Sequence, residues 1–236
     1  MYENEKVEKF QFRDFEIFTS KDIFPVNTDS ILFGALVNCI GFKNGLDIGT
    51  GNGILSIFFS RKCPQLNITA LDIDNRAIEI ANKNFVNYSR IRAIFDDFNH
   101  FAQNSTEQFD FIFSNPPYFE SDKLPRKQNF IIGKHTVMLS YKDLIKGVSL
   151  LLKENGKFSL IIPFRYMKKL IYLAGYYGLY EFHRIYIKYS KQKPIFRVIL
   201  EFAKEIRNFS EKTFIIAEGN DYSQEYKQLV LKYLKQ

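Results

Sequence analysis

The sequence contains little of what holds small secreted domains or metal centres together: two cysteines, three histidines and no tryptophan in 236 residues. Cys39 and Cys63 lie in apolar or helix-like contexts and outside any C-x-x-C pattern, so we predict no disulfide framework and no zinc site. We interpret both as buried or inert thiols. Three scattered histidines cannot supply a recognisable ligand set, so no bound metal is expected.

Long apolar runs are also missing. The longest, such as 158–164, fall well short of the ~18 residues that a membrane span requires, and Met1–Arg13 lacks the basic and apolar regions of a secretory signal. We therefore expect a cytoplasmic location and no membrane partner. No repeat, low-complexity block or linker occurs, so a single domain is expected over residues 1–236, with an N-terminal cap (1–44) and a core (45–236).

Apolar and basic residues are plentiful. Hydrophobic residues make up 46% of the chain, and 25 Phe with 14 Tyr can fill the core of one domain without help from disulfides. The formal net charge is +7, which favours association with a polyanion. We expect a monomer whose partner carries phosphate groups.

The hydrophobic pattern alternates between short apolar runs and helical periodicity, which is typical of an α/β fold. Strand material at 10–18, broken by a turn at Arg13–Asp14, is followed by Thr28–Asp29 as the N-cap of a helix. The expected strands after that are 46–48, 68–71, 92–95, 109–113, 157–163, 182–187, 198–202 and 214–216. The expected helices are 54–61, 76–85, 141–152 (ended by a turn at 154–156), 165–176 and 222–234.

A glycine-rich turn follows the first regular strand and contains Gly49, Gly51 and Gly53. Glycines without Cβ atoms allow a ligand to approach the backbone. The dinucleotide fingerprint would require glycine at Ile54, so its spacing does not fit. Asp47, two residues before the first glycine, would repel a pyrophosphate but attract an ammonium or sulfonium group. The turn therefore favours S-adenosylmethionine as the cofactor.

Carboxylates also follow the next two strands. Asp72 ends the second strand, where it could accept hydrogen bonds from both ribose hydroxyls, and we count the adjoining Ile73 with this site. After the third strand, Asp97, preferred over Asp96, could accept the exocyclic amine of an adenine, and Phe98 could pack on its ring. Carboxylates at the ends of successive parallel strands predict one cofactor site.

The most specific motif is Asn115-Pro116-Pro117-Tyr118, directly after the apolar strand 109–113. The two prolines stiffen the loop. The Asn115 Oδ1 and the Pro116 carbonyl could accept hydrogen bonds from the two N–H groups of an amine, while Tyr118 stacks on a planar group. Accepting both bonds frees the lone pair of a conjugated amine for attack on a methyl group. We predict catalysis by positioning and electrostatics, without a covalent intermediate.

Together these motifs resemble the class I S-adenosylmethionine-dependent amino-methyltransferases. The resemblance implies a Rossmann-like fold, with a seven-stranded, mostly parallel sheet, an antiparallel edge strand and a short N-terminal extension. Four flanking segments make the chain similar to the bacterial tRNA1(Val) adenine-N6 methyltransferase family, which modifies the adenosine 3′ to the anticodon: 26–35, 134–136, 194–200 and 220–226. The resemblance implies that Asp47, Gly49, Asp72 and Asp97 hold the cofactor and that Asn115–Tyr118 hold the target base.

Basic residues in two segments predict where RNA would lie. Residues 183–212 carry eight Lys or Arg against three Glu, with tyrosines interleaved, and a second basic stretch follows the Asn-Pro-Pro-Tyr motif. The residues that we predict to contact RNA are Arg126, Lys127, Lys134, His135, Lys188, Lys191, Lys193 and Arg197.

Three alternatives stay open on the sequence. A release-factor glutamine methyltransferase shares the Asn-Pro-Pro-Tyr motif, but the short segment before Gly45 leaves no room for its helical N-terminal domain. An adenine methyltransferase of ribosomal RNA or DNA would use the same chemistry. A non-catalytic module that binds adenosylmethionine or RNA is the alternative of a different class, and Asn115 with Asp72 argues against it.

Overall fold

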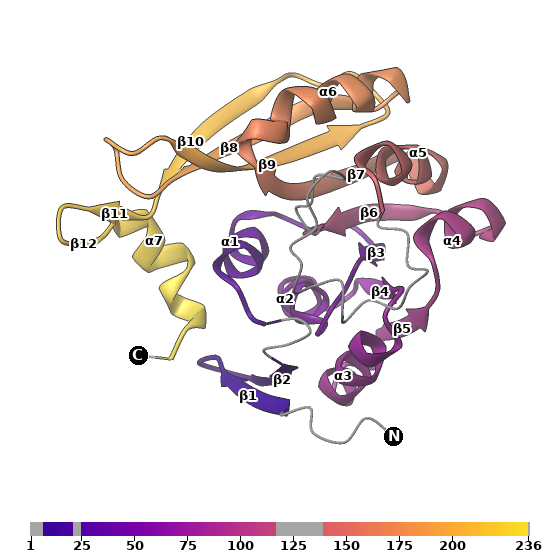
Figure 1. Cartoon of the computed structure of the whole chain (residues 1–236), viewed down its shortest axis with the longest axis horizontal. Helices are drawn as coiled ribbons and strands as arrows, with labels where there is room; N and C mark the ends of the chain where they lie inside the picture. The colour runs from indigo at the N-terminus through magenta and orange to yellow at the C-terminus, as the bar shows by residue number, and fades with distance from the viewer. Residues whose placement is uncertain (1–6, 21–24, 117–138, 236) are drawn as a thin grey trace, which may run out of the picture.

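The computed structural model describes residues 7–20, 25–116 and 139–235. Its centre is an eight-stranded sheet (Figure 1). The strands follow the order β10 (Ser210–Ile215), β8 (Tyr180–Lys188), β9 (Ile195–Ala203), β7 (Leu152–Pro163), β6 (Phe109–Ser114), β3 (Asn44–Ile48), β4 (Asn67–Asp72) and β5 (Ile91–Phe95). Only β9 runs antiparallel to its neighbours in this sheet.

The predicted α/β, Rossmann-like class is confirmed, but two details of the sheet differ from the prediction. The sheet has eight strands rather than seven, because β10 pairs in parallel with β8. The antiparallel strand β9 lies between β7 and β8 and is not an edge strand. Strand order depends on pairing between distant segments, which local periodicity does not report.

Helices cover both faces of the sheet (Figure 1). One face packs against α1 (Thr28–Leu36), α2 (Ile54–Lys62), α3 (Asn75–Phe85) and the hairpin of β1 (Val7–Gln11) and β2 (Glu16–Ser20). The other face packs against α4 (Phe98–Asn104), α5 (Tyr141–Leu151) and α6 (Met167–Tyr176). Alternate residues of β6 serve the two faces: Phe111 and Phe113 join the first core and Ile112 joins the second. Burial on both faces explains the continuous apolar runs of the central strands.

Several element boundaries differ from the prediction for local reasons. The N-cap of α1 is Asn27 rather than Thr28–Asp29, because the Asn27 side chain accepts a hydrogen bond from the Ser30 amide. The predicted turn at 154–156 lies inside β7, at a shift of register against β6. Helix α4 was missed, since it has only seven residues. A 3-10 turn (Phe164–Tyr166) precedes α6.

The predicted helix over 222–234 is interrupted. A small hairpin of β11 (Ala217–Glu218) and β12 (Asp221–Tyr222) leads into α7 (Gln224–Leu229), and a 3-10 turn (Leu231–Tyr233) follows. The Ser223 hydroxyl accepts from the Tyr226 amide and starts α7 two residues later than predicted. The end of the chain then joins the N-terminal hairpin, where Leu234 forms an isolated bridge with Phe12.

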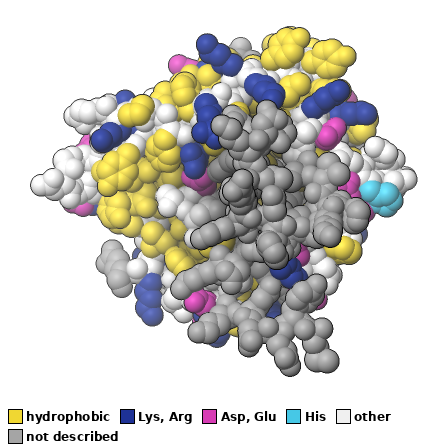
Figure 2. Space-filling view, in the orientation of Figure 1, with side chains coloured by type: hydrophobic (Ala, Val, Ile, Leu, Met, Phe, Trp, Pro, Cys, Tyr) yellow, Lys and Arg dark blue, Asp and Glu magenta, His cyan; other side chains and the backbone are white. Residues whose placement is uncertain are grey.

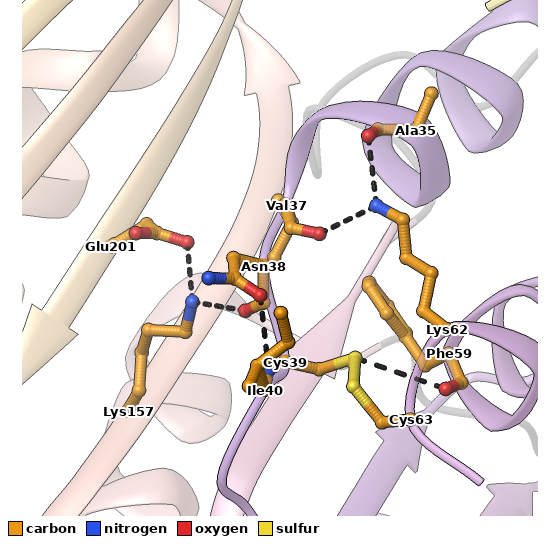
Figure 3. Close-up of a disulfide and its surroundings, with 10 residues drawn as sticks. All are labelled: Ala35, Val37, Asn38, Cys39, Ile40, Phe59, Lys62, Cys63, Lys157 and Glu201. Atoms are coloured by element: carbon orange, nitrogen blue, oxygen red, sulfur yellow. Dashed lines mark hydrogen bonds and ion pairs between the residues drawn. A yellow bond between two sulfur atoms is a disulfide. The ribbon is translucent and has the colours of Figure 1, made fainter. Parts of the chain in front are cut away.

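The prediction for the cysteines is wrong, because Cys39 and Cys63 form a disulfide (Figure 3). Cys39 follows α1, and Cys63 is the C-cap residue of α2. These neighbouring helices bring the two Cα atoms to 6.3 Å although 24 residues separate the cysteines in sequence. Lys62 of α2 also holds the end of α1, since its Nζ donates to the carbonyls of Ala35 and Val37, each at 2.8 Å.

Candidate active site

The glycine turn joins β3 to α2 at the carboxyl edge of the sheet. All three glycines have positive φ angles, 72° at Gly49, 58° at Gly51 and 83° at Gly53. Among the described residues, none has an atom within 4 Å of a Cβ atom placed at Gly49, so the backbone there has open space beside it. A Cβ atom at Gly53 would lie 2.4 Å from the Phe85 ring, so glycine at this position also allows α3 to pack closely. The turn is therefore open to a ligand at Gly49 and closely packed at Gly53.

Asp47 lies completely buried beneath this turn. Its Oδ2 accepts hydrogen bonds from the hydroxyls of Thr50 at 2.8 Å and Ser56 at 2.7 Å, whereas its Oδ1 has no partner among the described residues. Burial raises the pKa of the carboxyl to about 7. A buried acceptor that lacks a partner suits a ligand with a cationic or N–H donor group, as the expected cofactor has.

Asp72 at the end of β4 organises the turn from the neighbouring strand. Its Oδ2 accepts from the Gly51 amide at 2.8 Å, and its Oδ1 accepts from the Asp74 amide at 2.9 Å. Burial raises its pKa to about 6. Asp74 has a different role, because it caps α3 and forms an ion pair with Arg76. The carboxylate has about four lone-pair sites, so it could also accept a hydrogen bond from a hydroxyl.

The residues after β5 have structural duties in addition to the predicted ones. Asp97 is the N-cap of α4, where its Oδ1 accepts the amides of Asn99 and His100. The Phe98 ring is buried in the core against Gly147 of α5, where a Cβ would lie 2.4 Å from the ring. By contrast Ile73, after β4, is 41% exposed and presents an apolar surface at this edge.

Asn115 comes directly after β6, the strand that pairs with β3. Because Ser114 lies opposite Ile48 in this pair, Asn115 and the glycine turn meet at the same edge, one strand spacing of about 4.8 Å apart. The Ser114 hydroxyl fastens the junction by donating to the Ile48 carbonyl at 2.8 Å. The Asn115 Nδ2 donates to the Ser30 hydroxyl oxygen at 3.0 Å. Pro116 is buried, whereas Pro117 and Tyr118 lie outside the described residues.

The residues of the C-terminal half that we predict to contact RNA lie on β8, β9 and the loop between these strands. Strand β8 runs in the same direction as β7 and β6, so Lys188 and the loop 189–194 lie at the same edge as Asn115. Lys191 and Lys193 stand exposed in this loop, and Lys191 pairs with Glu218. Lys and Arg side chains are numerous over this half of the molecule (Figure 2). The other four predicted contacts lie outside the described residues: Arg126, Lys127, Lys134 and His135.

Arg197 is less exposed than the loop lysines. Its Nε donates to the Asp29 carboxylate at 2.7 Å and so ties β9 to the beginning of α1. The guanidinium also lies over the Phe196 ring. A structural role therefore accompanies the RNA contact that we predict for it.

Sequence reasoning missed Ser30 and Arg165. Ser30 contacts Asn115 from a segment 85 residues away in sequence, which no local pattern could show. Arg165 lies in the 3-10 turn after β7, two residues beyond Pro163, is exposed and stacks on Tyr166 with its Cζ 4.7 Å from the ring centre. The position of Arg165, two residues after a predicted core strand, was the available signal. The buried Tyr141 hydroxyl, whose pKa burial raises to about 12, has no hydrogen-bond partner in the described ranges.

Within 7–20, 25–116 and 139–235, no three His, Cys, Asp or Glu side chains are grouped as a metal site requires. None of the helices in these ranges has the length and hydropathy to span a membrane.

Solved structures share this fold. A predicted O-methyltransferase from Agrobacterium tumefaciens aligns with a TM-score of 0.68 at 16% identity, over 88% of this chain and 98% of that one. A methyltransferase from Pyrococcus furiosus aligns with a TM-score of 0.60 at 20% identity, over 82% of this chain and 91% of that one. At such identities the likeness shows the fold alone.

Sequence relatives are more informative. Residues 27–168 match the family model described as the methyltransferase small domain. The chain is 34% identical to the tRNA1(Val) (adenine(37)-N6)-methyltransferase of Vibrio vulnificus (strain YJ016), over 95% of this chain and 94% of the relative. It is 32% identical to the enzyme of the same name from Bacteroides thetaiotaomicron, over 95% and 96%. Near full-length similarity at this level shows that the chain belongs to the tRNA1(Val) (adenine(37)-N6)-methyltransferase family of methyltransferase small-domain proteins.

Proposed function

We propose that the protein transfers the methyl group of S-adenosylmethionine to N6 of adenine 37, 3′ to the anticodon, in tRNA1(Val). One observation carries the proposal: Asn115 stands one strand away from a glycine turn whose open side and buried carboxylates suit a cationic nucleoside. The family relatives support this substrate over ribosomal RNA, DNA or a release factor. A tRNA substrate also supports a cytoplasmic location, and we propose a single-domain monomer.

The cofactor site would use both buried carboxylates. Asp47 would face the charged portion of the cofactor, and Asp72 would accept ribose hydroxyls while it holds the Gly51 amide in place. Gly49 would leave room for backbone contact, and Ile73 would cover the adenine. We keep Gly53, Asp97 and Phe98 in the proposed site as residues that shape it from α2 and α4.

The target adenine would enter beside Asn115. When bound, S-adenosylmethionine supplies an electrophilic methyl group on a sulfonium. The Asn115 Oδ1 and the Pro116 carbonyl would accept hydrogen bonds from the two N6–H groups. This frees the nitrogen lone pair to attack the methyl group. The new C–N bond forms as the S–CH3 bond breaks, and N6 then loses a proton to water. A general base is unnecessary because the methylated amine is acidic at that stage.

The base must leave the anticodon stack to reach this site, as other base-modifying enzymes require. Tyr118 and the predicted basic residues 126–135 would hold the displaced nucleotide, while Lys188, Lys191, Lys193 and Arg197 would contact phosphates nearby.

The test incubates the protein with methyl-labelled S-adenosylmethionine and unmodified tRNA1(Val), then digests the RNA and identifies the labelled nucleoside by mass spectrometry. We expect N6-methyladenosine at position 37 and none in a transcript that carries guanosine there. Parallel reactions contain ribosomal RNA, DNA and release factor. Label in one of these, with none in tRNA, would refute the proposed substrate. Asn115→Ala serves as the inactive control.

A further inference from the structure

The side-chain amide of Asn115 has two chemically different ends. The proposed reaction needs the oxygen end, because only Oδ1 can accept an N6–H bond. The nitrogen end then needs an acceptor of its own, since this side chain is half-buried. The structure supplies that acceptor: Nδ2 donates to the Ser30 hydroxyl oxygen at 3.0 Å. In this arrangement the Ser30 hydroxyl accepts from Nδ2, which leaves Oδ1 to face the reacting amine.

Ser30 is itself held in place. It lies in the first turn of α1, is only 6% exposed, and its amide donates to the Asn27 Oδ1 at 2.8 Å. The adjoining Asp29 accepts from the Arg197 Nε at 2.7 Å, which fastens the beginning of α1 to β9. The start of the helix therefore has two independent anchors close to Asn115.

The far end of α1 is fastened as well (Figure 3). Lys62 donates to the Ala35 and Val37 carbonyls, the disulfide joins Cys39 to Cys63, and Lys157 donates to the Asn38 carbonyl. A helix anchored at both ends presents the Ser30 hydroxyl as a fixed partner, since neither its translation nor its rotation is free.

We propose that Ser30 is a positioning residue for methyl transfer, which orients the Asn115 amide so that Oδ1 faces the target amine. The proposal rests on the proposed function and extends it to a residue that does not touch the reacting atoms. It predicts an effect on kcat rather than on cofactor binding, because the orientation matters most at the transition state.

The decisive variants are Ser30→Ala and Ser30→Thr. Alanine removes the acceptor but favours helix, so α1 should persist; threonine keeps a hydroxyl at the same place. Thr28→Ala is the matched control, because it removes an exposed hydroxyl from the same helical turn. Thermal unfolding and S-adenosylmethionine titration of each variant show whether fold and cofactor site are intact.

We expect Ser30→Ala to lower kcat about fivefold, the factor that one neutral hydrogen bond is worth, with KM for tRNA and cofactor affinity nearly unchanged. Ser30→Thr should restore most of kcat, and Thr28→Ala should match the wild type. In the Asn115→Ala background, Ser30→Ala should cost nothing further, because the amide that it orients is gone. An unchanged kcat, or a loss seen only in KM or cofactor affinity, would overturn the proposal.

A second readout needs no substrate. The side-chain NH2 signals of Asn115 in a nitrogen–proton correlation spectrum are assigned by their disappearance in Asn115→Ala. They should shift in Ser30→Ala and stay in place in Thr28→Ala. If the Asn115 signals do not move in Ser30→Ala, the Ser30 proposal is refuted. Failure of the wild type to methylate tRNA would refute only the proposed function.

Discussion

The two halves of the sheet's carboxyl edge carry opposite charge. On the side of β3, β4 and β5 the edge is acidic, with Asp47, Asp72 and Asp97. On the side of β7, β9 and β8 it is basic, with Arg165, Lys188, Lys191, Lys193 and Arg197. Asn115 follows β6, between the two halves. The difference fits the proposed function, in which one edge would serve two ligands of opposite charge, a cationic cofactor and an RNA, with the reacting amine at the boundary.

Burial differs as much as charge does. Asp47 and Asp72 are 0% and 6% exposed and are fixed by hydrogen bonds, whereas Lys191 and Lys193 project into solvent. Buried carboxylates act over short distances with fixed geometry, and their pKa values respond to burial. Exposed lysines act over longer distances and are screened by salt. The two halves should therefore respond to different perturbations.

The largest loss of turnover should come from a change at Asn115, between the acidic and basic halves of the edge. Asn115→Ala removes the acceptor for the amine, so we expect turnover to fall by about two to three orders of magnitude, as when one transition-state hydrogen-bonding group is lost. Affinities for S-adenosylmethionine and tRNA should change less than about threefold. Single-turnover kinetics and separate binding titrations test this. Turnover at the wild-type rate would remove Asn115 from the mechanism.

Next in size is a change confined to the acidic half. Asp72→Ala deletes the acceptor of the Gly51 amide and of the proposed ribose hydroxyls. Cofactor binding should weaken by about 1–3 kcal/mol, while tRNA binding stays the same. Isothermal titration calorimetry measures the first quantity and filter binding the second. Equal cofactor affinity in the variant and the wild type would contradict the assignment.

A change confined to the basic half should have the reverse pattern. Replacing Lys188, Lys191 and Lys193 together by glutamine should weaken tRNA binding about tenfold at low salt and flatten the plot of log affinity against log salt. Cofactor affinity should stay constant. If the slope is the same in both proteins, this loop makes no phosphate contact.

The pH should act on the acidic half through its two buried carboxyls. Burial raises the pKa of Asp72 to about 6 and of Asp47 to about 7, from an ordinary value of 3.8. Without cofactor the two carboxyls favour the folded state most below pH 3.8, and this contribution is lost as the pH rises through about 6 to 7.

A cationic cofactor selects the ionised carboxylates, so its affinity should rise several-fold between about pH 5.5 and 7.5 and then level off, with protons released on binding. Calorimetry in two buffers of different ionisation enthalpy counts these protons. Asp72→Asn should release fewer of them. A cofactor affinity independent of pH over this range would show that neither carboxyl changes its ionisation on binding.

The smallest effect on either half should come from the disulfide. Reduction, or Cys39→Ser with Cys63→Ser, should lower the free energy of unfolding by about 3 kcal/mol, since the bond closes a loop of 24 residues. Both ligand affinities should be retained. Thiol titration of the native and denatured protein shows whether the bond is present, since such bonds are rare in proteins of the cytosol, the location that we propose. Two reactive thiols after denaturation without reductant would show that it does not.

Much of the proposed site could be predicted from the sequence because its signals are local. Glycines, the carboxylates near the ends of β3 and β4, and Asn115 after an apolar run predict a nucleoside site and an amine cradle from neighbouring residues alone. Predictions that depended on several distant segments did less well. The antiparallel strand β9 was placed at the edge, and the break after Leu229 was missed because Ser223 and the contact with Phe12 decide where that helix begins and ends.

The sequence by itself determined the fold class and the order of the motifs, and it predicted the residues of the proposed site, because backbone conformation and hydrophobic periodicity follow from adjacent side chains. Only the tertiary structure decided that Ser30 meets Asn115, that Arg197 joins Asp29 and that Cys39 bonds to Cys63. Each of these contacts joins segments at least 24 residues apart. Their partners are selected by the packing of helices on the sheet, which no window of sequence contains.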